Sequence, residues 1–571
     1  MAKQIKPIMT VGIGGAAGDG IREAGSNLGI LLNDVGLKTH FSFKYPSLIR
    51  GGHNYSRLSF SKEKIFYDYK KLDVLIALNE ESIKRHLGEL NKNAIVFAEN
   101  FDDEDKKALG ENAISLPLTE FITNIKAPSI TRSSVALGAL CYLLDLPLGN
   151  MTKIFNEIFR AKSPETNILL AEMGYKHLEK LNIKHSNLIA HELINSPTAE
   201  FIDGNTAVAR GLVAAGLNTY VSYPMTPSSS ILHFLASQER NFKIKVIHPE
   251  NEISSINMAL GMAYAGERVA VGTAGGGFAL MQEAFSLAGM AEVPLVVAVS
   301  QRHAPATGVP THSSQSDLRF VLHAGHGEFP RIVIAPGDPE ESFRAGADAL
   351  NLAWKYQLPA IVLLDKHVSE NMTTSTINPK SVMIEKGKIL ISVDSSYKRY
   401  ALSKDGVSPL AFPGTPNAVV KFDSYEHDEG GITTEEIPTI KAMQEKRFAK
   451  YASLAKEFKN FETVKTYGDP KSKNVIVFWG STKTVLLEAA KYFKKTVKIL
   501  QILWLEPFDV ASVSKNLKGA KKIINIESNH NGQLAGLIRE KTGIEVTNSI
   551  LRYDSAPFDP LELAETLNKL I

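Results

Sequence analysis

Short, continuous apolar runs alternate with amphipathic segments along almost the whole chain of 571 residues. The runs 94–98, 295–299 and 360–364 contain no polar residue, which is typical of strands buried on both faces of a parallel sheet. Strand and helix patterns that alternate in this way predict α/β domains. At ~150 residues a domain, the length indicates three or four of them.

The pattern divides the chain into three parallel-sheet α/β domains, which we place at residues 1–190, 200–395 and 471–571. Residues 396–470 do not show the alternating strand and helix pattern, and we expect an irregular crossing followed by a charged helix over Thr439–Phe458. We expect His185–Pro197 to form a loop after the first domain. In the first domain we predict strands over Met9–Ile13, Val74–Leu78 and Ala94–Ala98, and a helix over Ile21–Val35. In the second we predict strands over Thr219–Val221, Lys245–Ile247, Val269–Val271, Leu295–Val299, Arg331–Ile334 and Ala360–Leu364. In the third we predict strands over Val475–Phe478, Val497–Ile502 and Lys522–Ile526.

Composition excludes several classes of protein. The formal charge is only +3, from 64 Lys+Arg and 61 Asp+Glu, which argues against a nucleic-acid partner. The single cysteine, Cys141, excludes an internal disulfide, a thiolate zinc site and a four-thiolate iron–sulfur cluster held by this chain alone. It lies in the most apolar uncharged segment, 133–144, where we expect a plain core residue. That segment is shorter than the ~20 residues of a membrane span, and the start lacks a signal-peptide pattern, so we expect a cytoplasmic protein without a membrane partner.

Two glycine-rich patterns near the start invite cofactor interpretations that the neighbouring residues do not support. Gly12-x-Gly14-x-x-Ala17 nearly fits a dinucleotide-binding turn between a strand and a helix. The ribose-binding acid expected ~20 residues later is absent from residues 37–41, which favours a packing turn. Gly18-Asp19-Gly20 resembles the opening of a thiamine-diphosphate magnesium motif, but no asparagine follows at the required spacing. We therefore expect no metal or diphosphate site on this chain.

Three patterns in the second domain carry the strongest chemical signal. Glu252 heads a helix with the small residues 259, 261, 263 and 265, and a strand and a glycine turn, Thr273–Gly277, follow. The loops Ser222–Ser229 and Gln301–Thr311 each follow a predicted strand, so both lie at the carboxyl edge of the sheet, where such folds bind ligands. Prolines flank Thr226 on both sides, and Arg302 offers a bidentate grip for a carboxylate. Taken singly, each has an ordinary explanation as a helix-end carboxylate, a stiff turn or a surface arginine.

The chain resembles the alpha subunit of 2-oxoacid:ferredoxin oxidoreductases, in the form that carries a fused N-terminal gamma-type domain. Tyr223-Pro224-Met225-Thr226-Pro227 is similar to the family's Tyr-Pro-x-Thr-Pro signature. Further similar stretches, in the family's order, are 50–54, 301–311, 325–331, 426–429 and 527–533. One stretch departs: the family often has Ser-Gly-Pro-Gly where this chain has Ala274-Gly275-Gly276-Gly277.

This resemblance implies a gamma-type domain, a thiamine-diphosphate pyrimidine-binding domain and a transketolase C-terminal-like domain. It implies coenzyme A-dependent oxidative decarboxylation of a 2-oxoacid, 2-oxoglutarate before pyruvate, with electrons passed to ferredoxin. Magnesium and a [4Fe-4S] cluster are expected on a separate beta subunit, without which this chain is inactive. Catalytic roles are implied for Glu252, Thr226 and Arg302. Cofactor contacts are implied for Tyr223, Pro224, Thr226, Glu252, Gly275 and Gly276, and substrate contacts for Thr226, Arg302 and Thr311, with His326 a weaker candidate.

Three other functions remain open at this stage. A nicotinamide-dependent dehydrogenase would use the first glycine turn. A non-catalytic scaffold subunit would need none of the residues at the sheet edge. A cluster-free ketol transferase of the transketolase type would need a diphosphate site on this chain or on a cysteine-poor partner.

Overall fold

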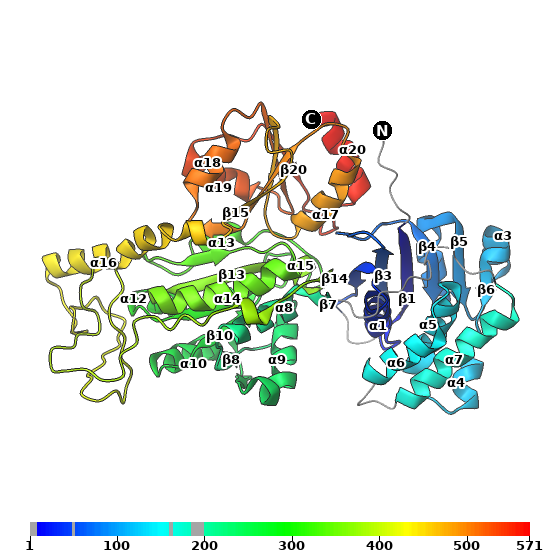
Figure 1. Cartoon of the computed structure of the whole chain (residues 1–571), viewed down its shortest axis with the longest axis horizontal. Coiled ribbons are helices and arrows are strands. Elements are labelled where there is room, and N and C mark those ends of the chain that lie inside the picture. The colour runs from blue at the N-terminus through cyan, green and yellow to red at the C-terminus, as the bar shows by residue number, and fades with distance from the viewer. Residues whose placement is uncertain (1–7, 48–51, 159–163, 184–198) are drawn as a thin grey trace. The chain divides into compact units, whose positions relative to one another are not determined.

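A computed structural model describes residues 8–47, 52–158, 164–183 and 199–571 (Figure 1). Backbone contacts divide the chain into two compact units, Met1–Ile202 with Asn371–Thr376, and Asp203–Glu370 with Ile377–Ile571. The described residues form three sheets in which parallel pairs predominate, which confirms the predicted α/β class. The predicted loop His185–Pro197 lies outside the described residues, as do Arg50 and Gly51 of the first family-like stretch.

The first sheet has the strand order β6-β5-β4-β1-β3-β2-β14-β7. Its strands are β1 (Met9–Ala16), β2 (Lys38–Lys44), β3 (His53–Ser61), β4 (Leu72–Ala77), β5 (Leu90–Ala98), β6 (Ala113–Ser115), β7 (Glu200–Asp203) and β14 (Met372–Ser375). Strands β6, β5, β4 and β1 are parallel, whereas β3, β2 and β14 add by antiparallel pairing, so this sheet is mixed rather than parallel. The apolar-run criterion missed β2 and β3 because polar residues interrupt both strands.

The helices of the first unit include a tightly packed pair. The α-helices described in this unit are α1 (Ile21–Asp34), α2 (Glu80–His86), α3 (Asp103–Leu109), α4 (Leu118–Asn124), α5 (Arg132–Leu143), α6 (Leu148–Ile158) and α7 (Pro164–Lys180), and the pair is α5 and α7. A Cβ on Gly138 of α5 would overlap the carbonyl oxygen of Ala171 of α7, so the two backbones are in direct contact. Cys141 of α5 is fully buried, and burial raises the pKa of its thiol to about 12, which fits the expected core residue.

The glycine turn predicted from Gly12 onward begins later than expected, at residue 17, and leads into α1 at Ile21. Strand β1 continues to Ala16, and Gly12 and Gly14 lie inside it, where a Cβ on Gly12 would stand 2.6 Å from the Tyr55 hydroxyl. These glycines admit neighbouring side chains to the strand and do not form a phosphate-binding turn. The Asp19 carboxylate, part of the magnesium-like motif, accepts a hydrogen bond from the Ala16 N–H at 2.9 Å and forms an ion pair with Arg132.

The second sheet has the order β18-β12-β13-β11-β10-β8-β9, and only the edge strand β18 is antiparallel to its neighbour. Its strands are β8 (Thr219–Val221), β9 (Lys245–Ile247), β10 (Val269–Thr273), β11 (Leu295–Gln301), β12 (Ile332–Ile334), β13 (Pro359–Asp365) and β18 (Trp504–Glu506). Its helices are α8 (Gly204–Ala214), α9 (Ser229–Phe242), α10 (Glu252–Tyr264), α11 (Gly275–Leu280), α12 (Gln282–Met290), α13 (Leu318–Leu322), α14 (Pro339–Tyr356) and α15 (Lys366–Glu370). All six strands predicted in this region are present.

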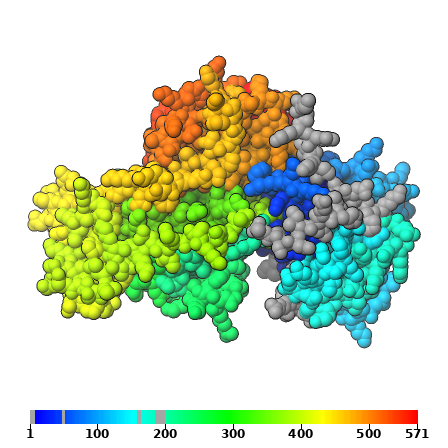
Figure 2. All heavy atoms as spheres, viewed as in Figure 1, coloured from blue at the N-terminus to red at the C-terminus, as the bar shows by residue number. Residues whose placement is uncertain are grey.

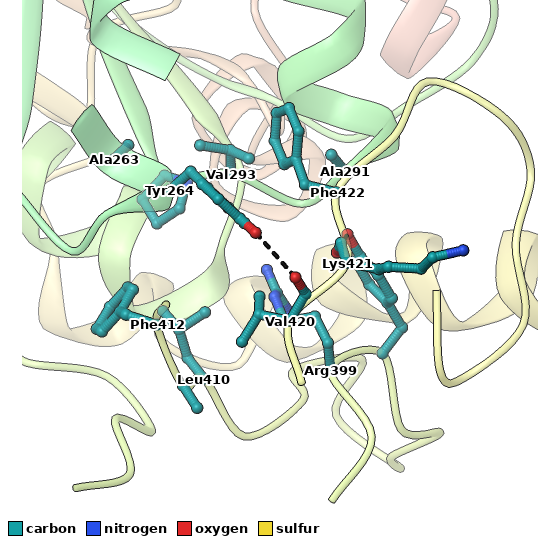
Figure 3. A pocket seen from close by; sticks show the side chains of 13 residues that line it. Ala263, Tyr264, Ala291, Val293, Arg399, Leu410, Phe412, Val420, Lys421 and Phe422 are labelled. Carbon is teal, nitrogen blue, oxygen red and sulfur yellow. Dashed lines mark hydrogen bonds between the residues drawn. The ribbon is translucent and has the colours of Figure 1, made fainter. Parts of the chain in front are cut away.

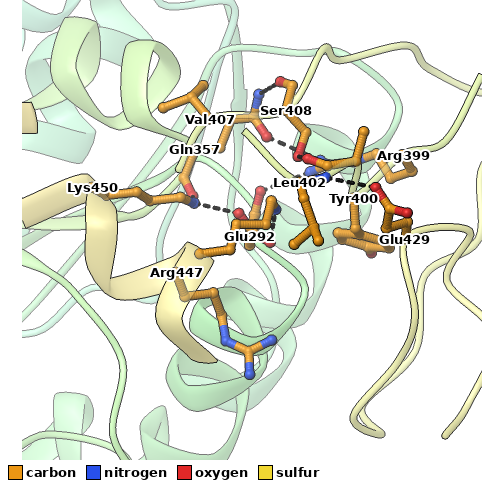
Figure 4. Close-up of polar contacts among 12 residues, drawn as sticks. Glu292, Gln357, Arg399, Tyr400, Leu402, Val407, Ser408, Glu429, Arg447 and Lys450 are labelled. Carbon is orange, nitrogen blue, oxygen red and sulfur yellow. Dashed lines mark hydrogen bonds and ion pairs between the residues drawn. The ribbon is translucent and has the colours of Figure 1, made fainter. Parts of the chain in front are cut away.

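The irregular crossing at 377–436 leads into the long helix α16 (Ile437–Ala455), the yellow-green and yellow part of Figure 2. Buried ion pairs attach the helix to the second sheet region: Lys446 and Lys450 lie 2.5 and 2.6 Å from the two carboxylate oxygens of Glu292 (Figure 4). These lysines hold the pKa of Glu292 well below its usual range. The crossing and α10 also line a small, largely apolar pocket, where the Tyr264 hydroxyl donates to the Val420 carbonyl at 2.8 Å (Figure 3).

The third sheet has the order β15-β17-β16-β19-β20. Its strands are β15 (Val464–Gly468), β16 (Asn474–Phe478), β17 (Lys498–Ile502), β19 (Lys522–Glu527) and β20 (Asn548–Leu551), with α17 (Thr482–Ala489), α18 (Val510–Leu517), α19 (Gln533–Thr542) and α20 (Pro560–Leu570). The buried side chain of Gln315 joins this sheet to the second, donating to the Trp479 carbonyl and accepting from the Ser528 N–H. In the described part of the chain, no helix combines the length and apolarity needed to cross a membrane.

Candidate functional site

The carboxyl ends of three adjacent parallel strands define the candidate site. Strands β8, β10 and β11 are neighbours in the second sheet, with Val221 opposite Val271 and Thr273 opposite Val299. The segments that leave these ends are therefore brought to one edge of the sheet, as the sequence predicted. They carry the Tyr223–Pro227 loop, the three glycines after Ala274, and Arg302.

Hydrogen bonds from α8 and within the loop itself hold the loop after β8 in place. Asn205 of α8 is fully buried and donates from Nδ2 to the Pro227 carbonyl at 2.7 Å. The Ser228 hydroxyl and its backbone N–H both donate to the Met225 carbonyl at 2.8 Å, which closes a tight turn around Thr226. Tyr223 and Thr226 remain half-buried, so this loop presents fixed but accessible groups at the sheet edge.

Glu252 is buried without a partner for one of its oxygens. It is the first residue of α10 and only 3% exposed, yet Oε1 has no hydrogen-bond partner. Helix capping does not explain it, because the preceding Asn251 caps the helix through the Ser254 N–H at 2.8 Å. A buried, unpaired carboxylate oxygen is costly, which favours a group that pairs with it in the complete site.

The three glycines begin a short helix instead of forming the predicted turn. Strand β10 ends at Thr273, and Gly275–Gly277 form the first turn of α11. A Cβ on Gly277 would stand 2.7 Å from Glu252 Oε1 and would overlap the Thr273 hydroxyl, so a side chain there is excluded. Gly276 faces open space, with its nearest neighbour 3.8 Å from a Cβ placed there. The missing side chain at Gly277 thus lets the backbone of α11 lie close against the unpaired Glu252 oxygen.

Arg302 is joined to the predicted Thr226 loop. Its Nη1 donates to the Thr226 carbonyl at 3.0 Å, which holds the guanidinium across the ends of β11 and β8. Burial lowers the pKa of Arg302 from its usual value, and Asp317 opposes that shift. An arginine has five N–H donors, so this bond leaves others for an anion.

The structure does not bring every predicted residue into this group. Thr311 is buried in the same loop as Arg302, but its hydroxyl pairs with His312 at 3.3 Å. His326 is exposed and contacts Ser286 of α12, in the segment that enters β12. Since β12 is parallel to β13, that segment lies at the opposite edge of the sheet, so the structure does not bring His326 to the Thr226 loop.

Sequence reasoning missed three residues that shape the site. Asn205 supports the Thr226 loop. Thr273 lies where a side chain on Gly277 would be, and Asp317 lies beside Gly275. Asp317 follows a Ser-rich stretch before a short helix, which by pattern alone indicates an ordinary helix cap. Only the fold shows that these residues converge.

The assembled groups suit a ligand with two recognisable features. A polar ring atom could pair with the unpaired Glu252 oxygen, and an anionic group could pair with the free donors of Arg302. Within the described ranges, no cluster of three or more His, Cys, Asp or Glu side chains is placed to hold a metal ion.

We predict that Gly277→Ala disrupts this edge of the sheet, because the added methyl would overlap Thr273 and press on Glu252. Overpacking of this kind costs about 1–3 kcal/mol of unfolding free energy, measurable by chemical denaturation. Gly261→Ala is the matched control, because nothing lies within 4 Å of its added methyl on α10. That control is expected to keep or slightly raise stability; equal stability of the two variants would refute the crowding.

Comparison with known proteins places the chain. Residues 210–446 match a family described as pyruvate flavodoxin/ferredoxin oxidoreductase, thiamine diphosphate-binding, and residues 10–177 match one described as pyruvate ferredoxin/flavodoxin oxidoreductase. The alpha subunit of a Sulfolobus 2-oxoacid:ferredoxin oxidoreductase is 32% identical, with 98% of this chain and 96% of that protein covered. The 2-oxoglutarate oxidoreductase subunit KorA of Mycobacterium tuberculosis is 27% identical over 98% of this chain and 90% of that protein.

A solved structure agrees with these relatives. The 2-oxoglutarate:ferredoxin oxidoreductase of Magnetococcus marinus, with 2-oxoglutarate, coenzyme A and succinyl-CoA bound, superposes with a TM-score of 0.89. Its sequence is 29% identical, and the match covers 99% of this chain and 100% of that one. The named relatives are subunits of larger enzymes. The chain therefore belongs to the family of 2-oxoacid:ferredoxin oxidoreductase alpha subunits, as the sequence motifs indicated.

Proposed function

We propose that this chain supplies the pyrimidine-binding half of the active site in a coenzyme A-dependent 2-oxoacid:ferredoxin oxidoreductase. We take 2-oxoglutarate as the favoured substrate because the Magnetococcus marinus enzyme that it resembles over its whole length was solved with that acid bound. Pyruvate is the runner-up. The observation that carries the proposal is the buried Glu252, whose Oε1 has no hydrogen-bond partner and lies against the backbone of Gly277.

The residues at the sheet edge fit the pyrimidine end of thiamine diphosphate. Bound there, the cofactor would supply a carbon nucleophile for the keto group of the acid. Glu252 would hold a proton between Oε1 and a ring nitrogen, which ends the cost of its unpaired burial. Tyr223, Pro224, Gly275 and Gly276 would border the ring at the two neighbouring strand ends.

The substrate end of the site belongs to Arg302 and Thr226. The bond from Arg302 to the Thr226 carbonyl fixes the guanidinium, so its remaining donors are positioned in advance for the carboxylate of the acid. The Thr226 hydroxyl would contact cofactor and substrate. Thr311 would reach the substrate only if its hydroxyl turned from His312.

The remaining parts of the reaction would come from a partner. The chain has one cysteine, which cannot hold a four-thiolate cluster, and Asp19 of the magnesium-like motif is paired with Arg132. We therefore assign the [4Fe-4S] cluster, the magnesium ion and the diphosphate site to a separate beta subunit in the cytoplasm, with ferredoxin as electron acceptor. Domains 1–190, 200–395 and 471–571 would be the gamma-type, pyrimidine-binding and transketolase C-terminal-like domains, with 396–470 joining the last two.

We predict that Glu252→Gln abolishes the proton relay, because an amide cannot exchange the proton in the same way. In the complex with the beta subunit, 2-oxoacid-dependent reduction of ferredoxin should fall by about 100-fold or more. Glu250→Gln, an exposed change two residues away, should leave the rate within about twofold. Full activity of the Glu252 variant would favour a scaffold role for the chain.

We predict that Arg302→Ala mainly weakens binding of the acid. Loss of a charged hydrogen bond of about 1.5–3 kcal/mol should raise KM for 2-oxoglutarate by at least about tenfold. Arg302→Lys should recover part of this loss, since it keeps the charge without the planar donor pair. Arg319→Ala is the control, because Arg319 pairs with Glu540 elsewhere. An unchanged KM in Arg302→Ala would exclude the assigned role, and running pyruvate alongside would rank the two substrates.

A further inference from the structure

Asp317 occupies a helix-capping position without capping its helix. It is the residue before α13, yet its side chain accepts no backbone N–H from that helix. Aspartates in the same position elsewhere do cap: Asp203 accepts from the Thr206 N–H at 2.7 Å, and Asp509 accepts from the Ser512 N–H at 3.0 Å. The Asp317 carboxyl group therefore does not bond the backbone N–H groups at the start of its own helix.

The carboxyl group points toward the candidate site instead. Asp317 is 9% exposed, and its Oδ2 is buried with no hydrogen-bond partner. A Cβ on Gly275 would overlap that oxygen, so the carboxyl group lies directly against the first turn of α11. Its backbone is fixed there, because the Asp317 N–H donates to Gln301 Oε1 at 2.9 Å.

Few charges face this carboxyl group. Arg302, at the end of β11, is the charge that acts on it, while the first turn of α11 contributes glycines alone. Glu252 of α10 lies on the other side of that turn, next to Gly277. Arg319 of α13 itself pairs with Glu540 of α19. Burial raises the pKa of Asp317 to about 6, and Arg302 counteracts this only in part.

We propose that Asp317 is a positioning residue that sets how strongly Arg302 holds the carboxylate of the 2-oxoacid. The proposal rests on the function assigned above to Arg302. When ionised, Asp317 offsets the charge of the guanidinium and repels an incoming carboxylate; when protonated, it leaves the guanidinium free for the substrate. Affinity for the acid thus falls as the pH rises through the titration of this one side chain.

Asp317→Asn tests this, because the amide has the same shape and cannot ionise. In the complex with the beta subunit, the KM of the wild type for 2-oxoglutarate should rise about three- to tenfold between pH 5.5 and 7.5. The variant should keep the low KM throughout, with a much smaller change in kcat. Asp559→Asn is the matched control: Asp559 caps α20 through the Glu562 N–H, so its pH profile should follow the wild type.

A second measurement needs only this chain. Because the folded pKa of about 6 lies above the ordinary 3.8, stability falls as the pH rises from about 4 to about 6. Asp317→Asn should therefore unfold at a temperature about 1–3 °C higher than the wild type at pH 7.5, with a smaller gain at pH 5. Parallel KM profiles in an active complex, or a variant less stable at pH 7.5, would overturn the role of Asp317 alone. A wild-type complex that oxidises no 2-oxoacid would overturn the proposed function, and this proposal with it.

Discussion

The candidate site depends on one buried carboxylate, one of whose oxygens has no hydrogen-bond partner among the described residues. Glu252 is held at the start of α10, which Asn251 caps, so helix formation alone does not require its burial. Because residue 277 is a glycine, the first turn of α11 packs against the unpaired Oε1 without a clash. Burial of the unpaired oxygen reduces the stability of the isolated chain, and this cost is explained if a cofactor completes the hydrogen bond.

The parallel sheet turns this carboxylate into a site. Strands β8, β10 and β11 end at one edge, so the Thr226 loop, the glycines of α11 and Arg302 converge although they are far apart in sequence. Asn205 of α8 holds the Thr226 loop through its bond to the Pro227 carbonyl. Buried pairs between Glu292 and the lysines of α16 attach the irregular crossing to the same sheet region. Rigid support of this kind keeps polar groups in place before a ligand arrives.

The strands that end at this edge could be predicted from the sequence, because buried parallel strands appear in it as continuous apolar runs. All six strands of the second sheet region that were predicted are present, and Arg302 bonds the Thr226 carbonyl at their carboxyl edge. Strands β2 and β3 escaped notice because buried polar residues such as Ser59 interrupt their apolar pattern. Gly12 and Gly14 suggested a turn, but their role is to admit side chains from neighbouring elements to a strand. No sequence pattern singled out Asp317, because only the tertiary arrangement places its carboxyl group against Gly275 and away from the N–H groups of α13.

The central claim is that Glu252 pairs with the pyrimidine of thiamine diphosphate at this sheet edge. The most direct test is an experimental structure of the chain with its beta subunit and the cofactor, read out as the distance from Glu252 Oε1 to the nearest ring nitrogen. We expect a hydrogen bond of about 2.6–3.2 Å, with the ring beside Gly276. A cofactor bound elsewhere, or a Glu252 that pairs with another protein side chain in the complex, would contradict it.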